Sequence, residues 1–307
     1  MNDHFKLTIA LLAGALAATA PAARANDNDT FPNLSGEILI EVENDWTFES
    51  EDPDSEINDL FTTTEPFLTL NLIEGLSIRA GMVLEPAHDP GPSDDRFFED
   101  HGLFVETLSI TYEHHRFALV GGKFTPNFGI AWDAAPGIYG VDFAEDYELA
   151  ERIGIGASIN LISKSLGTHA LSASTFFLDN SVLSRSAFTS RGETDIADGG
   201  PSNTGDLSSF VIGLDGGEFP GLEGLRYHVA FAHQESGVGG TADERGFVIG
   251  IEHALELADD IEIAPIVEYA FLDNAGGVAG SDTHYLTAGA SLGIDHWSLN
   301  MVYAMRR

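Results

Sequence analysis

The sequence predicts an all-β protein, an antiparallel β-barrel that crosses a membrane. Three observations support this fold class: an export signal at the N-terminus, segments in which apolar and polar residues alternate, and joints between those segments that are short and long in turn. Each segment has about ten residues, the length that a tilted strand needs to cross a bilayer. No apolar stretch after the signal has the length of about 18 residues that indicates a transmembrane helix.

Residues 1–25 have the order of a secretory signal peptide. Lys6 precedes the apolar run 7–20, and the small-residue site Ala23-Arg24-Ala25 follows it. An apolar run of about 14 residues is too short to span a bilayer as a helix. We therefore expect cleavage before Asn26 and one mature barrel domain, residues 26–307.

The chain is strongly acidic, with a formal net charge of −35 at pH 7. Residues 1–25 hold Lys6, Arg24 and Asp3, so the mature chain keeps 12 of the 14 Lys and Arg and 48 of the 49 Asp and Glu. Such a chain repels nucleic acid and attracts cations. No nucleic-acid partner is therefore expected. The chain has no cysteine, which excludes disulfides and thiolate metal ligands.

Alternation with a period of two defines six segments in the first half of the chain. At 37–46, isoleucine and valine share one face and Glu37 and Glu41 share the other. At 76–85, apolar residues oppose Arg79 and Glu85. The six predicted strands are 37–46, 61–72, 76–85, 104–113, 116–125 and 149–162.

Seven more segments follow the same pattern in the second half. The total of thirteen is odd, whereas bacterial barrels usually have an even number of strands because both ends lie on the periplasmic side. We favour a 14-stranded barrel whose last strand is missing from this chain, with 12 strands as the alternative. These seven predicted strands are 168–178, 207–215, 224–233, 246–255, 261–271, 283–293 and 296–305.

The joints alternate in length, which places short turns at one rim and long loops at the other. In a bacterial barrel the short turns face the periplasm and the long loops face the outside. The short joints are 74–75, 114–115, 163–167, 257–260 and 295–296, and the long ones are 50–59, 86–102, 126–148, 179–206, 235–245 and 273–282.

The stretch GGKFTPNFGIAWD, residues 121–133, carries a resemblance to a known family. It resembles the G-[QK]-F-x-P-x-F-G junction at which a strand enters a long loop in some general and phosphate-selective Gram-negative outer-membrane porins. The resemblance implies passive diffusion of small hydrophilic solutes and ions through a barrel narrowed by an inserted loop, and it assigns that constriction to loop 126–148. The matching residues are Gly122, Lys123, Phe124, Pro126, Phe128 and Gly129.

Charged residues on the loop and on lumen-facing positions are the candidate pore-lining residues. Carboxylates that face basic side chains across a narrow gap would favour cations, and the small number of basic residues argues against a phosphate preference. The alternative is that these acids only solvate an extracellular loop. The loop candidates are Asp133, Asp142, Glu145 and Asp146, the basic candidates are Arg79, Lys123, Arg152 and Arg226, and the acidic wall candidates are Glu37, Glu41, Glu85, Glu262 and Glu268. The loop aromatics Trp132, Tyr139, Phe143 and Tyr147 are expected to pack against the wall.

No motif for catalysis or for a dedicated metal site is present. The acidic loops lack the spacing of a calcium-binding loop, and neither G-x-S-x-G nor H-E-x-x-H occurs. We expect no enzyme activity, no cofactor and no metal site. The expected partners are outer-membrane lipid and lipopolysaccharide, bridged through divalent cations, together with a second and third copy in a homotrimer. Three alternatives remain open: a non-conducting structural or adhesive barrel, a barrel enzyme and a soluble secreted β-protein with its apolar side inward.

Overall fold

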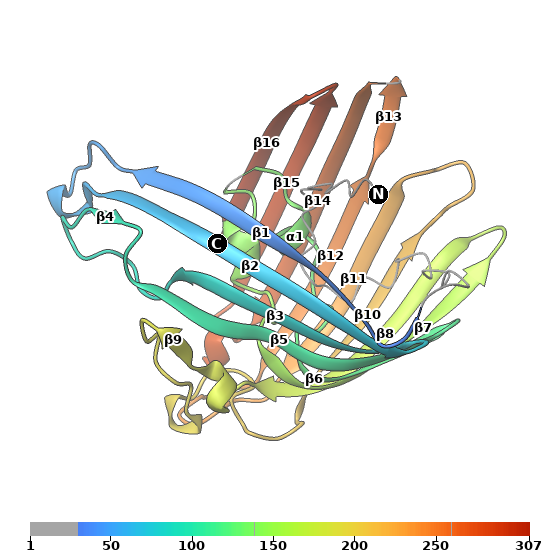
Figure 1. Ribbon diagram of the computed structural model, residues 1–307, viewed down its shortest axis with the longest axis horizontal. Helices are drawn as coiled ribbons and strands as arrows, with labels where there is room; N and C mark the ends of the chain where they lie inside the picture. Colours follow the sequence, from blue (N-terminus) through green and yellow to red (C-terminus); the bar gives the residue numbers. More distant parts are fainter. Residues whose placement is uncertain (1–29, 138, 259) are drawn as a thin grey trace.

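The computed structural model describes residues 30–137, 139–258 and 260–307. The predicted signal peptide, residues 1–25, lies outside these ranges. The described chain forms one large curved antiparallel sheet, and a segment with two short helices lies within its curve (Figure 1). None of the helices in the described ranges has the length and apolar character needed to cross a membrane.

Thirteen strands follow one another along the main path of the sheet, and each pairs antiparallel with the next. Three short strands lie off this path: β4 (Arg96–Phe97), β9 (Ser186–Phe188) and β13 (Leu255–Ala258). The path consists of β1 (Asn33–Trp46), β2 (Asn58–Ile73), β3 (Leu76–Pro86), β5 (His101–His114), β6 (Phe117–Phe124), β7 (Arg152–Ser163), β8 (Gly167–Leu178), β10 (Ser209–Gly217), β11 (Leu225–Gln234), β12 (Glu244–His253), β14 (Ile261–Asp273), β15 (Thr283–Ile294) and β16 (Trp297–Arg306).

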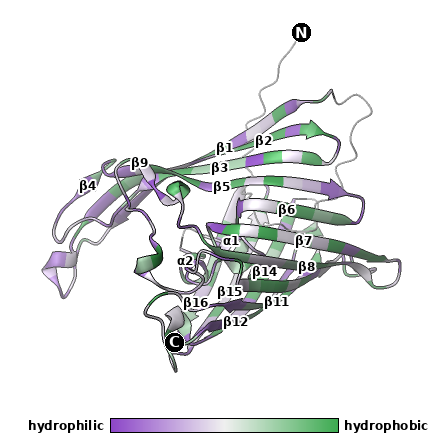
Figure 2. Ribbon diagram, turned by 90° about the horizontal axis from the view of Figure 1, so that it is seen from below, coloured by the Kyte–Doolittle hydropathy of each residue, from purple (hydrophilic) through white to green (hydrophobic). Residues whose placement is uncertain are grey.

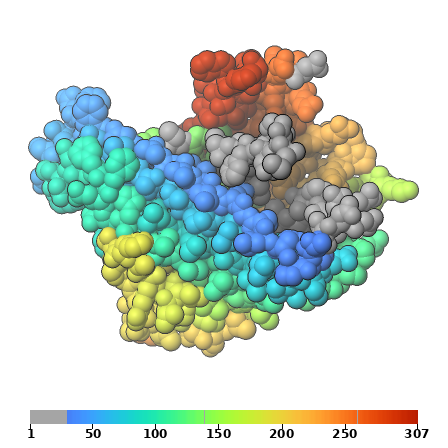
Figure 3. Space-filling model, viewed as in Figure 1, coloured from blue at the N-terminus to red at the C-terminus, as the bar shows by residue number. Residues whose placement is uncertain are grey.

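These thirteen strands coincide with the thirteen predicted segments, which confirms the all-β antiparallel fold class. Successive strands alternate in direction, so β1 and β16 at the two ends of the path run the same way. In Figure 3, β1 crosses the front of the molecule in blue and β16 stands behind its upper edge in red. Closure of the barrel and a count of 12 or 14 strands stay predictions.

The short segments outside the sheet lie mainly in the long loops. The two α-helices, α1 (Ala131–Ala134) and α2 (Asp142–Glu145), belong to the loop between β6 and β7. Four 3₁₀ turns lie in other long loops: η1 (Pro53–Ser55), η2 (Val182–Ser184), η3 (Ile196–Asp198) and η4 (Ala275–Gly277).

The two faces of the sheet differ in composition. We call the face that contacts the β6–β7 loop the inner face, and the opposite one the outer face. On β16 the outer face exposes Trp297 (82%), Leu299 (65%) and Met301 (73%). On the inner face the buried residues include serine and threonine, such as Ser172 and Thr287. The soluble alternative requires its apolar side chains on the inner face, whereas exposed large apolar side chains recur along the strands on the outer face. Figure 2 shows how hydrophilic and hydrophobic residues alternate along the strands.

Candidate pore constriction

The β6–β7 loop, residues 125–151, turns onto the inner face directly after β6. β6 is short and ends at Phe124. Gly122 and Gly129 have φ values of 125° and 88°, which side chains with a Cβ rarely adopt, so these two positions of the junction allow the turn. Phe128 is 1% exposed. The loop therefore packs inside the curve of the sheet, and the role of 126–148 as a constriction stays a prediction.

Because β6 ends early, one edge of β5 has no β6 partner near the rim that carries the long loops. The short strand β9 pairs with β5 at this position. Residues Gly102–Phe104 of β5 pair with Ser186–Phe188 of β9, in the loop that follows β8. Because β9 belongs to the loop 179–208, this loop completes the sheet at the position that β6 has left. It contributes to the wall, whereas the loop 125–151 enters the interior.

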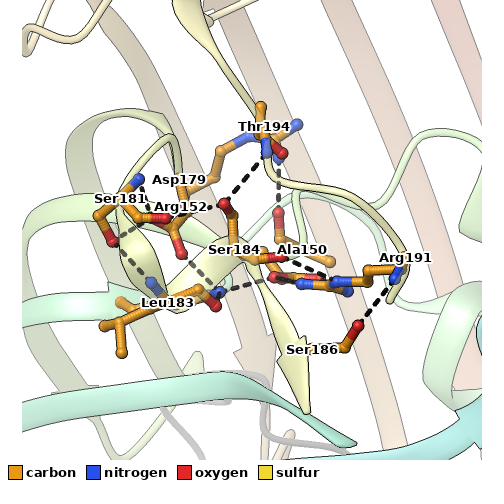
Figure 4. A network of polar contacts seen from close by, with 11 residues as sticks. Ala150, Arg152, Asp179, Ser181, Leu183, Ser184, Ser186, Arg191 and Thr194 are labelled. Carbon is orange, nitrogen blue, oxygen red and sulfur yellow. Dashed lines mark hydrogen bonds and ion pairs between the residues drawn. The ribbon is translucent and has the colours of Figure 1, made fainter. Parts of the chain in front are cut away.

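A buried charge network holds the loop 179–208 in this position (Figure 4). The Nζ atom of Lys123 lies 2.6 Å from carboxylate oxygens of both Glu151 and Asp179 and donates to the Leu183 carbonyl at 3.0 Å. Arg191 donates to both oxygens of Glu151, at 2.7 and 2.6 Å. The Lys123 side chain is 0% exposed. The prediction that Lys123 lines the pore is corrected, because its ammonium group is enclosed by this network.

Glu268 on β14 anchors the start of the inserted loop. Its carboxylate accepts hydrogen bonds from the backbone N–H groups of Ile130 at 2.8 Å and Ala131 at 2.9 Å, and from the Tyr147 hydroxyl at 2.7 Å. The residue is 1% exposed. The expectation that Glu268 faces the water of a pore is therefore also corrected: its lumen-facing parity is right, but the loop covers it.

Two further anchors lie on β10 and β11. The Gly129 N–H donates to Nε2 of His228 at 3.1 Å, so Nδ1 carries the ring proton and donates to Asp215 at 2.8 Å. Asn127 donates to the other oxygen of Asp215 at 2.8 Å and to Ser172 at 3.2 Å. The sequence gives no signal for this set beyond strand parity, because its members come from four separate segments.

Inner-face glycines make room for the loop. A Cβ atom at Gly246 would lie 2.5 Å from the Phe128 ring, and one at Gly250 would lie 2.7 Å from the Glu268 carboxylate. A Cβ at Gly289 would lie 2.9 Å from the ring of Pro136. These glycines alternate with large outward residues in β12 and β15, so their parity in the sequence indicates the part of the wall that receives the loop.

The loop aromatics pack against the wall, as the sequence predicts, at three of four positions. Trp132 and Tyr147 are buried in the cluster between the loop and the wall, and Phe143 packs against it half-buried. Tyr139 is 58% exposed instead, and its hydroxyl donates to Asp45 of β1 at 2.6 Å. Asp146 bonds Arg306 of β16 at 2.7 Å. The loop thus contacts both end strands of the sheet.

The loop carboxylates lie near other carboxylates. Burial raises the pKa of Glu145, and the charges of Asp142, Asp146 and Glu65 of β2 raise it further. Burial raises the pKa of Glu148 to about 8, with Glu106 of β5 and Glu145 adding to the effect and Arg152 opposing it. The predicted arrangement of loop acids opposite basic side chains is therefore corrected: of the predicted basic candidates only Arg152 acts on Glu148, and Asp146 pairs instead with Arg306.

A β-bulge contributes Glu106 to this acidic region. The register between β3 and β5 shifts between Gly81 and Met82, so that Thr107 and Val105 are paired and Glu106 has no partner across the strands. A bulge re-aims the side chain of its extra residue. Glu106 is not among the residues predicted from the sequence, because strict alternation cannot locate a bulge.

Five of the other candidates do not converge on the loop. Arg79 pairs with Glu113 at 2.6 Å and Arg226 pairs with Glu252 at 2.8 Å. Glu37, Glu41 and Glu262 are exposed on β1 and β14. Asp133 belongs to the loop itself and is partly buried, and Glu85 on β3 is partly buried and feels the charge of Glu145. Within the described ranges, no group of three or more His, Asp or Glu residues is arranged to hold a metal ion.

Comparisons with known proteins find no matching family model and no matching curated protein. Among solved structures, the chain is similar to the outer membrane protein OpdK of Pseudomonas aeruginosa, with 12% identity and a TM-score of 0.45, covering 89% of this chain and 64% of that one. It therefore spans just under two thirds of OpdK. The outer membrane channel DcaP of Acinetobacter baumannii has 12% identity and a TM-score of 0.46, with 90% and 78% covered. OmpF of Salmonella typhi has 11% identity and a TM-score of 0.42, covering 89% of this chain and 90% of that one.

Proposed function

We propose that this protein is an outer-membrane porin of a Gram-negative bacterium, in which small hydrophilic solutes and ions diffuse passively through a water-filled, cation-biased pore. The observation that carries the proposal is an acidic loop anchored on the inner face of a sheet whose outer face is apolar and exposed. In this proposal the sheet closes into a barrel, and the loop narrows its lumen.

The outer face supports the membrane location. Burial of one large apolar side chain is favourable by about 1.5–3 kcal/mol, and residues such as Ile38, Ile212 and Met301 are exposed on different parts of the sheet. Lipid would cover this surface, with the signal peptide providing export. Lipopolysaccharide bridged by divalent cations and assembly into a trimer belong to the same proposal.

The loop acids support the cation bias. Asp142, Glu145 and Glu148 have no ion pair with a basic side chain within the described ranges, and Glu65 and Glu106 face them from the wall. Charges on outer loops are screened over about 8–10 Å at physiological salt, whereas charges at a narrow point act on every ion that passes. Movement needs no energy coupling, because the solute gradient drives it.

The test is single-channel recording in planar bilayers with refolded mature protein across a KCl gradient. We expect discrete current steps and a reversal potential biased toward cations, and a smaller bias in the double variant Glu145→Gln/Glu148→Gln. Glu256→Gln, on the exposed short strand β13, is the matched control. An anion-biased potential would contradict the cation preference. Silence from protein shown to be folded and inserted would contradict conduction and favour a structural barrel.

A further inference from the structure

A cavity of about 330 Å³ lies between the end of the inserted loop and the wall. Tyr147 and Glu148 line it from the loop, and Gln234, Glu244 and Tyr285 line it from β11, β12 and β15. Arg152, the first residue of β7, lines this cavity and also a neighbouring one of about 440 Å³ beside the Lys123 network. Arg152 is therefore shared by the linings of the two cavities.

Arg152 has unused hydrogen-bonding capacity. Its Nη1 donates to the Ala150 carbonyl at 2.5 Å and its Nη2 reaches Gln234 only at 3.5 Å. Its Nε is buried and has no partner. Glu244, the wall carboxylate of the cavity, is already bonded by Gln234 at 2.5 Å and by the Gly276 N–H at 2.7 Å. Arg152 forms no ion pair with a described carboxylate.

Glu148 lines the same cavity as Arg152 and carries the group of opposite charge. In the described part of the chain, its carboxylate has neither a hydrogen bond nor an ion pair, although the Arg152 charge lowers its pKa. Burial and the charges of Glu106, Glu145 and Asp133 have the stronger, opposite effect, and together they raise the pKa to about 8. An arginine and a glutamate thus line one cavity without bonding each other.

We propose that this cavity binds zwitterionic solutes of the amino acid and short peptide class, with the solute carboxylate on Arg152 and its ammonium group on Glu148. The inference rests on the proposed porin function and deepens it, because it names a class of solute that pauses beside the constriction. The cavity volume is within the range of small-molecule sites.

The charges select a zwitterion over a simple ion. A plain anion at Arg152 would meet Glu148, Glu244 and Asp146, which line the same cavity. A plain cation at Glu148 would meet the unpaired charge of Arg152. A solute with both charges satisfies both side chains, and Phe128, Tyr147 and Tyr285 offer ring surfaces to its aliphatic part.

Binding should release a proton. With a pKa of about 8, Glu148 is mostly protonated at pH 7 in the empty cavity. A bound ammonium group favours the carboxylate form, so the proton leaves to the buffer as the ion pair forms. The measured heat of binding should then depend on the ionisation heat of the buffer at pH 7, and this dependence should disappear in Glu148→Gln.

The experiment is isothermal titration of the mature protein in detergent with dialanine, N-acetyl-dialanine and dialanine amide. We expect dialanine to bind at least about ten-fold more tightly than either derivative, because each derivative loses one bond to a charged group. Arg152→Gln and Glu148→Gln should each lose the same factor. Arg245→Gln is the matched control and should bind as the unaltered protein does, because its side chain is exposed and does not line the cavity.

Equal affinity for the three compounds, or full affinity in Arg152→Gln, would overturn the inference. Absence of dialanine binding to protein that conducts ions would also overturn it and leave the porin function standing. Selective binding to protein that does not conduct would support the cavity and contradict the porin. Circular dichroism of each variant establishes that it has folded.

Discussion

The two longest loops of the described chain differ in how far their charged side chains form ion pairs. In the loop 179–208, Asp179 and Arg191 are joined to Lys123 and Glu151 in a continuous buried network. The loop 125–151 ends in Glu151 of that network and pairs Asp146 with Arg306. Three of its anchors are backbone N–H groups, and Asp142, Glu145 and Glu148 form no ion pair in the described part of the chain. The first loop is part of the wall. The second keeps three carboxyl groups free of ion pairs, as the proposed constriction requires.

The largest effect should come from breaking the wall loop's network with Lys123→Met. Loss of the ammonium group leaves Asp179 buried without a counter-charge, and Glu151 keeps only Arg191 as a partner. Removal of one partner from a buried ion pair costs about 3–5 kcal/mol. Urea unfolding in detergent measures this. Lys164→Met, in the β7–β8 turn, is the control. A loss below about 1 kcal/mol in Lys123→Met would show that the network does not hold the loop.

The next effect should come from the anchor of the inserted loop. Glu268→Ala removes the acceptor of three hydrogen bonds, and each bond to a charged group contributes about 1.5–3 kcal/mol. We expect a lower free energy of unfolding and, in bilayers, a noisier current with weaker cation preference as the loop moves. A quiet channel with unaltered selectivity would show that the loop is held elsewhere.

A smaller effect is expected at the wall glycines. Gly250→Ala places a Cβ 2.7 Å from the Glu268 carboxylate, so the loop must shift, at a cost of about 1–3 kcal/mol. Gly121→Ala is the matched control, because its Cβ would meet Ile155 at an ordinary 3.7 Å. Thermal unfolding of the pair distinguishes the two sites. Equal melting temperatures would contradict close packing of loop and wall.

The smallest effect is the pH dependence of selectivity. Because the pKa of Glu148 is raised to about 8, it gains its charge as the pH rises from 7 to 9, and the cation preference should increase by less than two-fold over this range. The folded state binds this proton more tightly than the unfolded chain does, so the stability linked to it decreases as the pH rises from about 4.5 to about 8 and levels off above that. Reversal potentials measure the first change, and Glu148→Gln should abolish it. A fall in cation preference with pH would be inconsistent with an acidic constriction.

The sequence predicts the strands well because each one alternates over its whole length, and the long-loop position of 126–148 follows from the same count. It predicts the site less well where alternation is interrupted. Gly122 turns the chain, so the parity of Lys123 no longer indicates its surroundings. Glu106 sits on a bulge. The burial of Glu268 depends on a loop more than a hundred residues earlier in the chain, and no local pattern reports such contacts.

The distance along the chain between the inserted loop and its anchors sets an order of assembly. Ile130 bonds to a residue 138 positions later in the sequence, and Gly129 to one 99 positions later. Contacts between distant residues form late because the chain between them must first be ordered. The sheet from β7 to β14 must therefore be in place before the loop can dock. In the proposed porin, the wall would thus be built around an empty interior, and the docking of the loop that narrows it would be among the last steps of biogenesis.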